Sequence, residues 1–93
     1  MVTEKEAIDR AVSYLEEIGS NYIKDSITIH FNSIEDHDNT VPIGKYEGEN
    51  FDVYAVGYDI PWAPDVIVYF LYVRADTGEL LYIITPTNYI EIE

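Results

Sequence analysis

The 93-residue chain contains no cysteine. Disulfide bonds, a cysteine nucleophile and cysteine-ligated zinc are therefore excluded. No apolar run approaches the ~18 residues of a membrane-spanning helix. The N-terminal stretch MVTEKEAIDR lacks the basic and then apolar pattern of a secretory signal. Together these absences predict a cytoplasmic protein that makes no membrane contact.

Basic residues are scarce throughout the chain. Five Lys and Arg stand against 18 Asp and Glu, which gives a net charge of −13. Residues 1–45 hold nine acids and four bases (−5), and residues 46–93 hold nine acids and one base (−8). A surface this acidic repels the phosphates of nucleic acid, and we therefore exclude nucleic-acid binding. Two alternatives remain: the charge serves solubility, or it attracts a basic protein partner.

Catalytic motifs are also missing. The chain has no glycine-rich phosphate loop and no serine in a nucleophile elbow. Its two histidines are His30, on the polar side of an expected strand, and His37, in an acidic loop. With 18 carboxylates, some pair at acid–base spacing arises by chance, so such spacing is uninformative. We therefore expect no enzymatic activity and no cofactor.

The segment EDHDNTVPIGKYE resembles a calcium-binding loop only in part. Asp36, Asp38, Thr40 and Glu47 occupy its first, third, fifth and twelfth positions. The sixth position, where the sharp turn requires glycine, is Val41, and a proline follows it. We therefore expect a solvated acidic loop and no metal site.

Residues 3–19 have the pattern of an amphipathic helix with both ends marked. Thr3 and Glu6 have the spacing of a capping box, and Gly19 is suited to the left-handed conformation that ends a helix. The apolar side chains recur at helical period on one face. They are Ala7, Ile8, Ala11, Val12, Leu15 and Ile18.

The remaining sequence predicts about four antiparallel strands. SITIHFNSI and FDVYAVGY are the first two, and a long irregular connection over residues 35–49 separates them. VIVYFLYVRA shows no polar alternation, which indicates a central strand, and ADTGE turns it into ELLYIIT. NYIEIE adds a short edge or wraps the sheet. The predicted fold class is α+β: a single domain over residues 1–93, with one N-terminal helix packed on an antiparallel meander sheet of about four strands.

A single helix covers only one face of such a sheet. The other face must be covered by residues 35–49 and the C-terminal tail, by a different partner, or by a second copy of the chain. The last alternative would make a homodimer through the uncovered sheet face.

The segment YDIPWAPD, residues 58–65, holds the single tryptophan between two prolines and two aspartates. We expect a short, stiff loop, because proline is disfavoured in helices and central strands. Trp62 is then either a lid on one end of the sheet or an anchor for a partner. As an anchor it would act with Tyr58, Asp59 and Asp65.

Two segments carry a resemblance to a known family. EKEAIDRAVSYLEEIG and VYFLYVRADTGELLYIITPTNYIEI together resemble the YrhB-like family of small bacterial toxin-immunity proteins. The matching residues are Ala7, Ala11, Leu15, Val73, Thr77, Gly78, Glu79, Thr85, Pro86, Tyr89 and Ile90. The approach to the penultimate strand departs from the family, which usually has glycines where this chain has IPWAPD. VRADTGELL is also similar to PepSY-type domains.

The immunity resemblance implies a non-enzymatic protein that binds and neutralises a cognate toxin. A toxin with a basic active-site cleft would attract an acidic inhibitor. From the residues themselves we predict a partner-binding surface made of Glu35, Asp36, Asp38, Tyr58, Asp59, Trp62 and Asp65. The PepSY resemblance implies an alternative, an accessory domain that regulates a peptidase or senses an envelope ligand.

Overall fold

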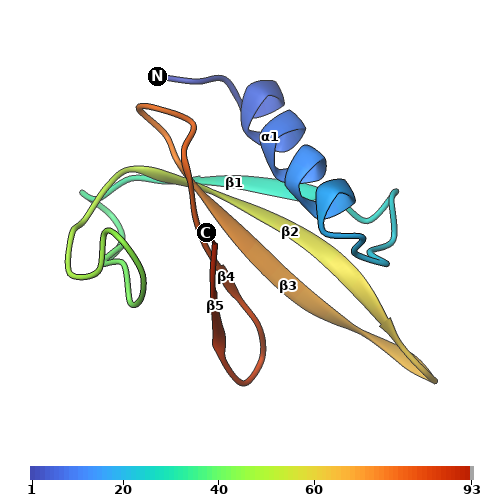
Figure 1. Cartoon of the computed structure of the whole chain (residues 1–93). Helices are drawn as coiled ribbons and strands as arrows, with labels where there is room; N and C mark the ends of the chain where they lie inside the picture. Colours follow the sequence, from blue (N-terminus) through green and yellow to red (C-terminus); the bar gives the residue numbers. More distant parts are fainter. Residues whose placement is uncertain (93) are drawn as a thin grey trace.

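The computed structural model describes residues 1–92, and it confirms the predicted α+β class. One helix packs on a five-stranded antiparallel sheet with the meander order β1-β2-β3-β4-β5 (Figure 1). The elements are α1 Glu4–Glu17, β1 Thr28–Asn32, β2 Val53–Trp62, β3 Asp65–Arg74, β4 Leu80–Ile84 and β5 Tyr89–Glu91. The sheet has one strand more than the predicted four or so, because residues after Pro86 pair with β4.

Helix α1 begins and ends where the sequence predicts. The Thr3 hydroxyl accepts the Glu6 N–H at 3.1 Å, and the Glu6 carboxylate accepts the Thr3 N–H at 3.1 Å. At the other end Gly19 adopts φ 70°, and the Ser20 N–H reaches back to the Leu15 carbonyl at 2.9 Å. This second bond is the defining contact of a Schellman motif. Local capping therefore fixes the length of the helix.

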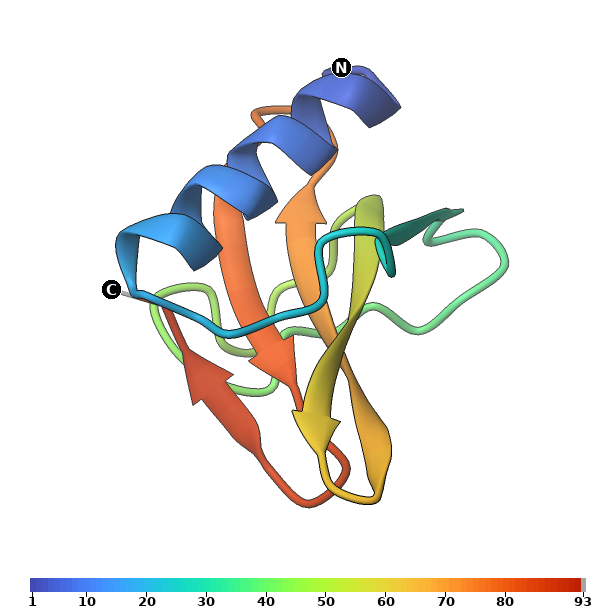
Figure 2. The same cartoon turned by 90° about the vertical axis from the view of Figure 1, so that its right-hand side faces the viewer.

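The main core lies between α1 and one face of the sheet, which we call the helix face (Figure 2). Two alanines let the helix backbone approach the strands closely, since their side chains occupy little space. The buried members are Ala7, Ala11, Leu15, Tyr22, Tyr54, Val56, Tyr58, Leu71, Val73, Ala75 and Ile83.

The opposite face, which we call the far face, is covered at one end by the chain itself. Val41 is buried there with Val53, Leu81 and Tyr82, and Ile43, Tyr46 and Phe51 pack around them. Of the alternatives left open by the sequence, the chain's own connection between β1 and β2 therefore supplies this cover.

Specific contacts hold that connection in place. The Tyr46 hydroxyl donates to Glu79 Oε1 at 2.9 Å, and the Arg74 guanidinium lies 4.0 Å from the centre of the Phe51 ring. The Asn39 side-chain amide donates to the carbonyls of Asn32 and Phe51, each at 2.9 Å. The connection therefore forms an ordered layer over the sheet.

The β2–β3 hairpin corrects the expectation of a loop at residues 58–65. Strand β2 runs to Trp62 and β3 starts at Asp65, so the connection contains only Ala63 and Pro64. The N–H and C=O of Asp59 point away from β3, to Ser26 and Ile23. Because Pro61 is two residues further on, its missing N–H also lies on the side away from β3. Strand β1 starts at Thr28, opposite Gly57, and does not reach the level of Pro61, so no neighbouring strand needs that donor.

Candidate protein-binding surface

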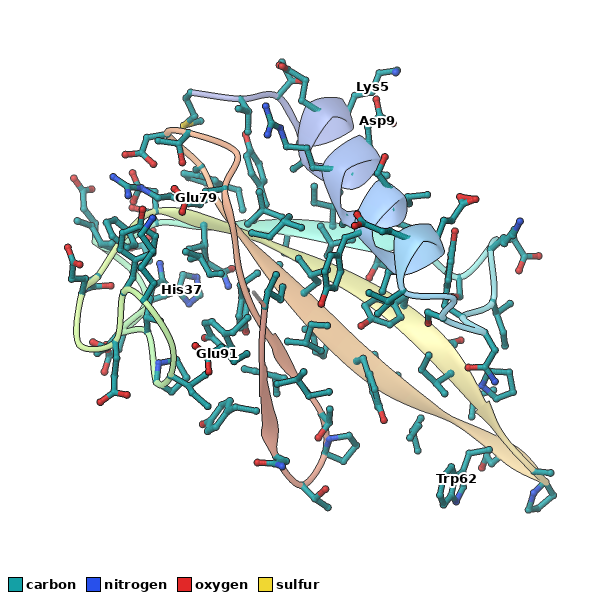
Figure 3. All side chains as sticks on the ribbon, in the orientation of Figure 1. Lys5, Asp9, His37, Trp62, Glu79 and Glu91 are labelled. Carbon is teal, nitrogen blue, oxygen red and sulfur yellow. The ribbon has the colours of Figure 1, made fainter. Side chains whose placement is uncertain are left out.

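The tip of the β2–β3 hairpin, residues 61–66, is exposed at every position. Trp62 is 65% exposed although it is the largest side chain in the protein. It pairs with Asp65 across the hairpin, at the end of ten consecutive β2–β3 residue pairs. Trp62 is therefore held by a regular strand pair and does not serve as a buried lid. Figure 3 places it at a corner of the molecule, away from the helix.

A shallow groove of about 260 Å³ lies beside Trp62. Its walls come from the helix face of the hairpin and from the turn between β4 and β5. The lining residues are Trp62, Ile67, Tyr69, Thr85, Pro86 and Thr87. Aromatic and aliphatic side chains dominate this lining, so the groove suits an apolar group of a binding partner.

Tyr58 is not part of the exposed surface, which corrects its predicted role as a partner contact. It is only 2% exposed and packs edge-to-face against Tyr22 and Tyr69. Burial raises the pKa of its phenol above the ordinary tyrosine value, and the neighbouring Tyr69 adds to the shift. Tyr58 faces the same side of β2 as Trp62, but the chain covers it and leaves Trp62 open.

The two aspartates of the hairpin occupy different faces. Asp65 pairs with Trp62 on the helix face, is exposed, and accepts the Val66 N–H at 2.9 Å. Asp59 pairs with Val68 on the far face and is half-buried. Asp65 is therefore the carboxylate that shares a surface with the indole.

The acidic residues Glu35, Asp36 and Asp38 lie far from the hairpin tip. They are exposed in the connection between β1 and β2, which joins the opposite end of β2 (Figure 1). In Figure 3 their neighbour His37 and Trp62 mark opposite sides of the molecule. The Thr40 hydroxyl donates to Asp38 and lowers the pKa of its carboxyl. The predicted site is thus two surfaces, one acidic and one aromatic.

Metal-ligating side chains do not cluster within residues 1–92. No three His, Asp or Glu side chains are placed to hold a metal ion among these residues. Both histidines are exposed, and tyrosines apart, the described residues contain no buried polar or charged side chain. Over the same range, no helix has the length and apolar character required to cross a membrane.

A larger groove of about 560 Å³ runs between α1 and the β3–β4 turn. Gly78 forms part of its wall with φ 79°, and a β-carbon there would lie 2.7 Å from Arg10 Nε. Asp9, Glu17 and Glu79 also line it, so its charges are mixed. It offers no single chemistry for a ligand to match.

Sequence reasoning missed an exposed apolar strip on β3. The unbroken apolar run predicted a central strand or one covered on both faces, and β3 is indeed the middle strand of the sheet. Its far face is nevertheless open near the hairpin tip, where Val66 is 41% and Val68 is 44% exposed. Strand β3 has ten residues and β4 only five, so no β4 side chain flanks Val66 and Val68 on that side of the sheet. The sequence does contain a signal for this exposure, because the apolar run VIVYFLYV of β3 is longer than the run LLYII of β4.

Comparisons of the chain with protein-family models, with curated proteins and with solved structures gave no match.

Proposed function

We propose that this protein is a non-enzymatic, cytoplasmic binding protein that neutralises a cognate bacterial toxin, as an immunity protein does. The observation that carries the proposal is a tryptophan 65% exposed at the tip of a regular strand pair, in a molecule of net charge −13. Tryptophan is among the residues that most often dominate protein interfaces.

The energetic support comes from the area that Trp62 leaves in water. A tryptophan buries about 150–250 Å² when fully covered, so covering the exposed 65% removes roughly 130 Å² from solvent. At about 25 cal/mol per Å² this gives roughly 3 kcal/mol before the costs of association. The regular ladder beneath Trp62 limits the ordering cost, because the backbone is already in its final conformation.

The charge supports a basic partner. The described ion pairs join Lys5 to Asp9, Lys45 to Glu79 and Arg74 to Asp76, so they occupy only three carboxylates. The remaining acids produce a negative field around the molecule. Under this proposal Trp62 and Asp65 make the contact. Glu35, Asp36 and Asp38, at the other end, contribute long-range attraction to a basic active-site cleft.

Co-expression with the toxin encoded by the neighbouring gene tests the proposal. The wild-type chain should protect the cells and bind the purified toxin, with an association rate that falls as ionic strength rises. Trp62→Ala should weaken binding by more than about tenfold, as expected for an interface hot spot. Ile18→Ala is the matched control, because Ile18 is 53% exposed at the end of α1.

Charge has its own matched pair of variants. Asp65→Asn should slow association more than Glu17→Gln, although each removes one exposed carboxylate. A toxin that kills equally with and without the wild-type chain would contradict the proposal. Dependence on a larger membrane protein would instead favour the accessory-domain alternative.

A further inference from the structure

Strand β3 extends beyond its neighbour on one side. Its ladder with β4 stops at the pair Phe70–Ile84. Residues 65–69 continue to the hairpin tip and pair only with β2. On the β4 side this stretch has no strand partner within residues 1–92. Figure 1 shows β4 turning into β5 before the hairpin tip is reached.

The unpaired backbone groups can be assigned from the opposite strand. The Asp59 N–H donates to Ser26 Oγ at 2.8 Å, and the Asp59 C=O accepts from the Ile23 N–H at 2.9 Å. Both groups therefore point away from β3. In an antiparallel ladder the residue opposite such a position also points its groups outward. That residue is Val68, whose N–H and C=O therefore face the open side of β3.

The backbone groups of Val66, two residues before Val68, also point to the open side of β3, but its N–H already has an acceptor. Its N–H donates to the Asp65 carboxylate at 2.9 Å, whereas its C=O has no described partner in residues 1–92. The open edge therefore offers one free donor, at Val68, and two acceptors, at Val66 and Val68. This set matches the hydrogen-bonding groups of one short extended segment.

The groove beside Trp62 lies along this same edge. Ile67 and Tyr69 form its wall on β3, and Pro86 forms part of the opposite wall in the β4–β5 turn. A segment added to β3 would place alternate side chains in this groove. The intervening side chains would lie beside Val66 and Val68 on the far face. Backbone bonds and apolar pockets would thus be available together.

We infer that the binding partner adds an extended, lysine- or arginine-bearing segment to the free edge of β3 at residues 66–68, beside Trp62. This inference rests on the proposed function and names the chemistry of the contact. The occupant is cationic because Asp65 flanks the edge and the whole molecule carries −13. A second copy of the chain would bring another −13 to the same place, and that repulsion disfavours pairing between copies.

A peptide of alternating lysine and valine, acetylated and amidated, is the probe. Trp62 is the only tryptophan, so its emission reports directly on the groove. The emission should shift to shorter wavelength and saturate as the peptide is added. A peptide of alternating lysine and proline has the same charge but lacks half of the amide donors. It should bind at least about tenfold more weakly, as should a peptide of alternating glutamate and valine.

Two substitutions at one position separate backbone from side chain. Val68→Pro removes the free N–H, and proline is accommodated on an open edge. Val68→Ala retains the N–H while it removes most of the same apolar bulk. Val68→Pro should weaken the lysine–valine peptide by about five- to tenfold more than Val68→Ala does. In the wild-type protein, hydrogen exchange of the Val68 amide should slow when the peptide binds, a result that needs no variant.

Equal binding of the lysine–valine and lysine–proline peptides would overturn strand addition, as would unchanged exchange at Val68. A dimer in sedimentation that Val68→Pro dissociates would assign the edge to a second copy and overturn the cationic partner. Either failure is distinguishable from failure of the proposed function. In both cases protection from the toxin, and its loss in Trp62→Ala, would persist if the immunity role is correct.

Discussion

Two aromatic residues four positions apart show how neighbouring side chains acquire different roles. Tyr58 and Trp62 point to the same face of β2, yet Tyr58 is 2% and Trp62 is 65% exposed. The difference arises because Tyr22 packs over Tyr58, whereas Trp62 lies further along the strand at the hairpin tip. The sequence predicted an aromatic surface here but did not separate the two residues. That separation depends on how far the chain covers the strand, which is a property of tertiary structure.

The first prediction contrasts these residues by stability. Trp62→Ala should lower the free energy of unfolding by less than about 1 kcal/mol, because an exposed side chain leaves no cavity. Tyr58→Ala should lower it by about 3–5 kcal/mol, because it empties a position in the core. Urea unfolding followed by circular dichroism measures both. A large loss in Trp62→Ala would return the indole to the role of a structural lid.

The second prediction concerns alkaline pH. Burial raises the pKa of Tyr58 above the ordinary value, so its phenol stays protonated in the folded state after the unfolded chain has ionised. The unfolded state then binds fewer protons. The contribution of Tyr58 to the free energy of unfolding should therefore be constant below about pH 10 and fall above it, by at most about 1.4 kcal/mol per pH unit.

Tyr58→Phe should make the alkaline fall in the free energy of unfolding shallower, as measured by urea unfolding at several pH values. A smaller fall should remain, because burial also raises the pKa of Tyr82. Tyr89→Phe is the matched control, since Tyr89 is 47% exposed. Equal slopes in wild type and Tyr58→Phe would show that the phenol of Tyr58 does not contribute.

At the scale of elements, the ends of the helix were predicted correctly from local sequence signals. The length of a strand that depends on its neighbours was not. The capping box of Thr3 and Glu6 and the glycine at position 19 mark α1 within a residue or two, because the hydrogen bonds they make are local. The predicted end of β2 was wrong, because the strand continues through Pro61 to Trp62. A proline lacks the N–H that a central strand needs, but this costs nothing where no neighbouring strand would accept that hydrogen bond. That circumstance depends on β1 starting only at the level of Gly57, which no local signal reveals.

The third prediction tests the helix cap. Thr3→Ala should lower the free energy of unfolding by about 1 kcal/mol, because it removes the acceptor of the Glu6 N–H. Ser13→Ala is the control, since it changes an exposed hydroxyl within the helix and slightly favours helix formation. Thermal unfolding of both variants makes the comparison.

Glu6 adds a pH test of the same cap. The N–H of Thr3 lowers the pKa of its carboxyl, so the charged form is favoured in the folded state. The stability advantage of wild type over Glu6→Gln should be complete above the ordinary glutamate pKa of about 4.3. It should disappear as the pH falls through the lower pKa of the folded protein. A difference that is independent of pH would exclude a contribution from the charge.

At the scale of the whole molecule, the charge follows from composition, but its placement does not. The sequence predicted one acidic and aromatic surface, whereas the fold separates Glu35, Asp36 and Asp38 from the hairpin tip. The molecule measures 38 × 27 × 25 Å, so under the proposed function the two surfaces would act on a partner at different ranges. At low salt the electrostatic field of the carboxylates extends over that distance, whereas Trp62 interacts only with groups in direct contact with it.

The fourth prediction tests this field through stability. Raising sodium chloride from about 20 mM to about 500 mM should raise the free energy of unfolding, because screening relieves repulsion among the carboxylates. Replacing Glu35, Asp36 and Asp38 with their amides should reduce this gain. Urea unfolding at each salt concentration measures it. A gain that is unchanged in the triple variant would show that these three residues do not dominate the repulsion.

The exposed hairpin tip also bears on how such a protein can evolve. Residues 61–66 belong to neither core cluster, while α1 and the connection between β1 and β2 cover the sheet elsewhere. New side chains at the tip are therefore nearly free of folding constraints. Under the proposed function, a lineage facing a changing toxin could alter its specificity there in single steps, without passing through unfolded intermediates.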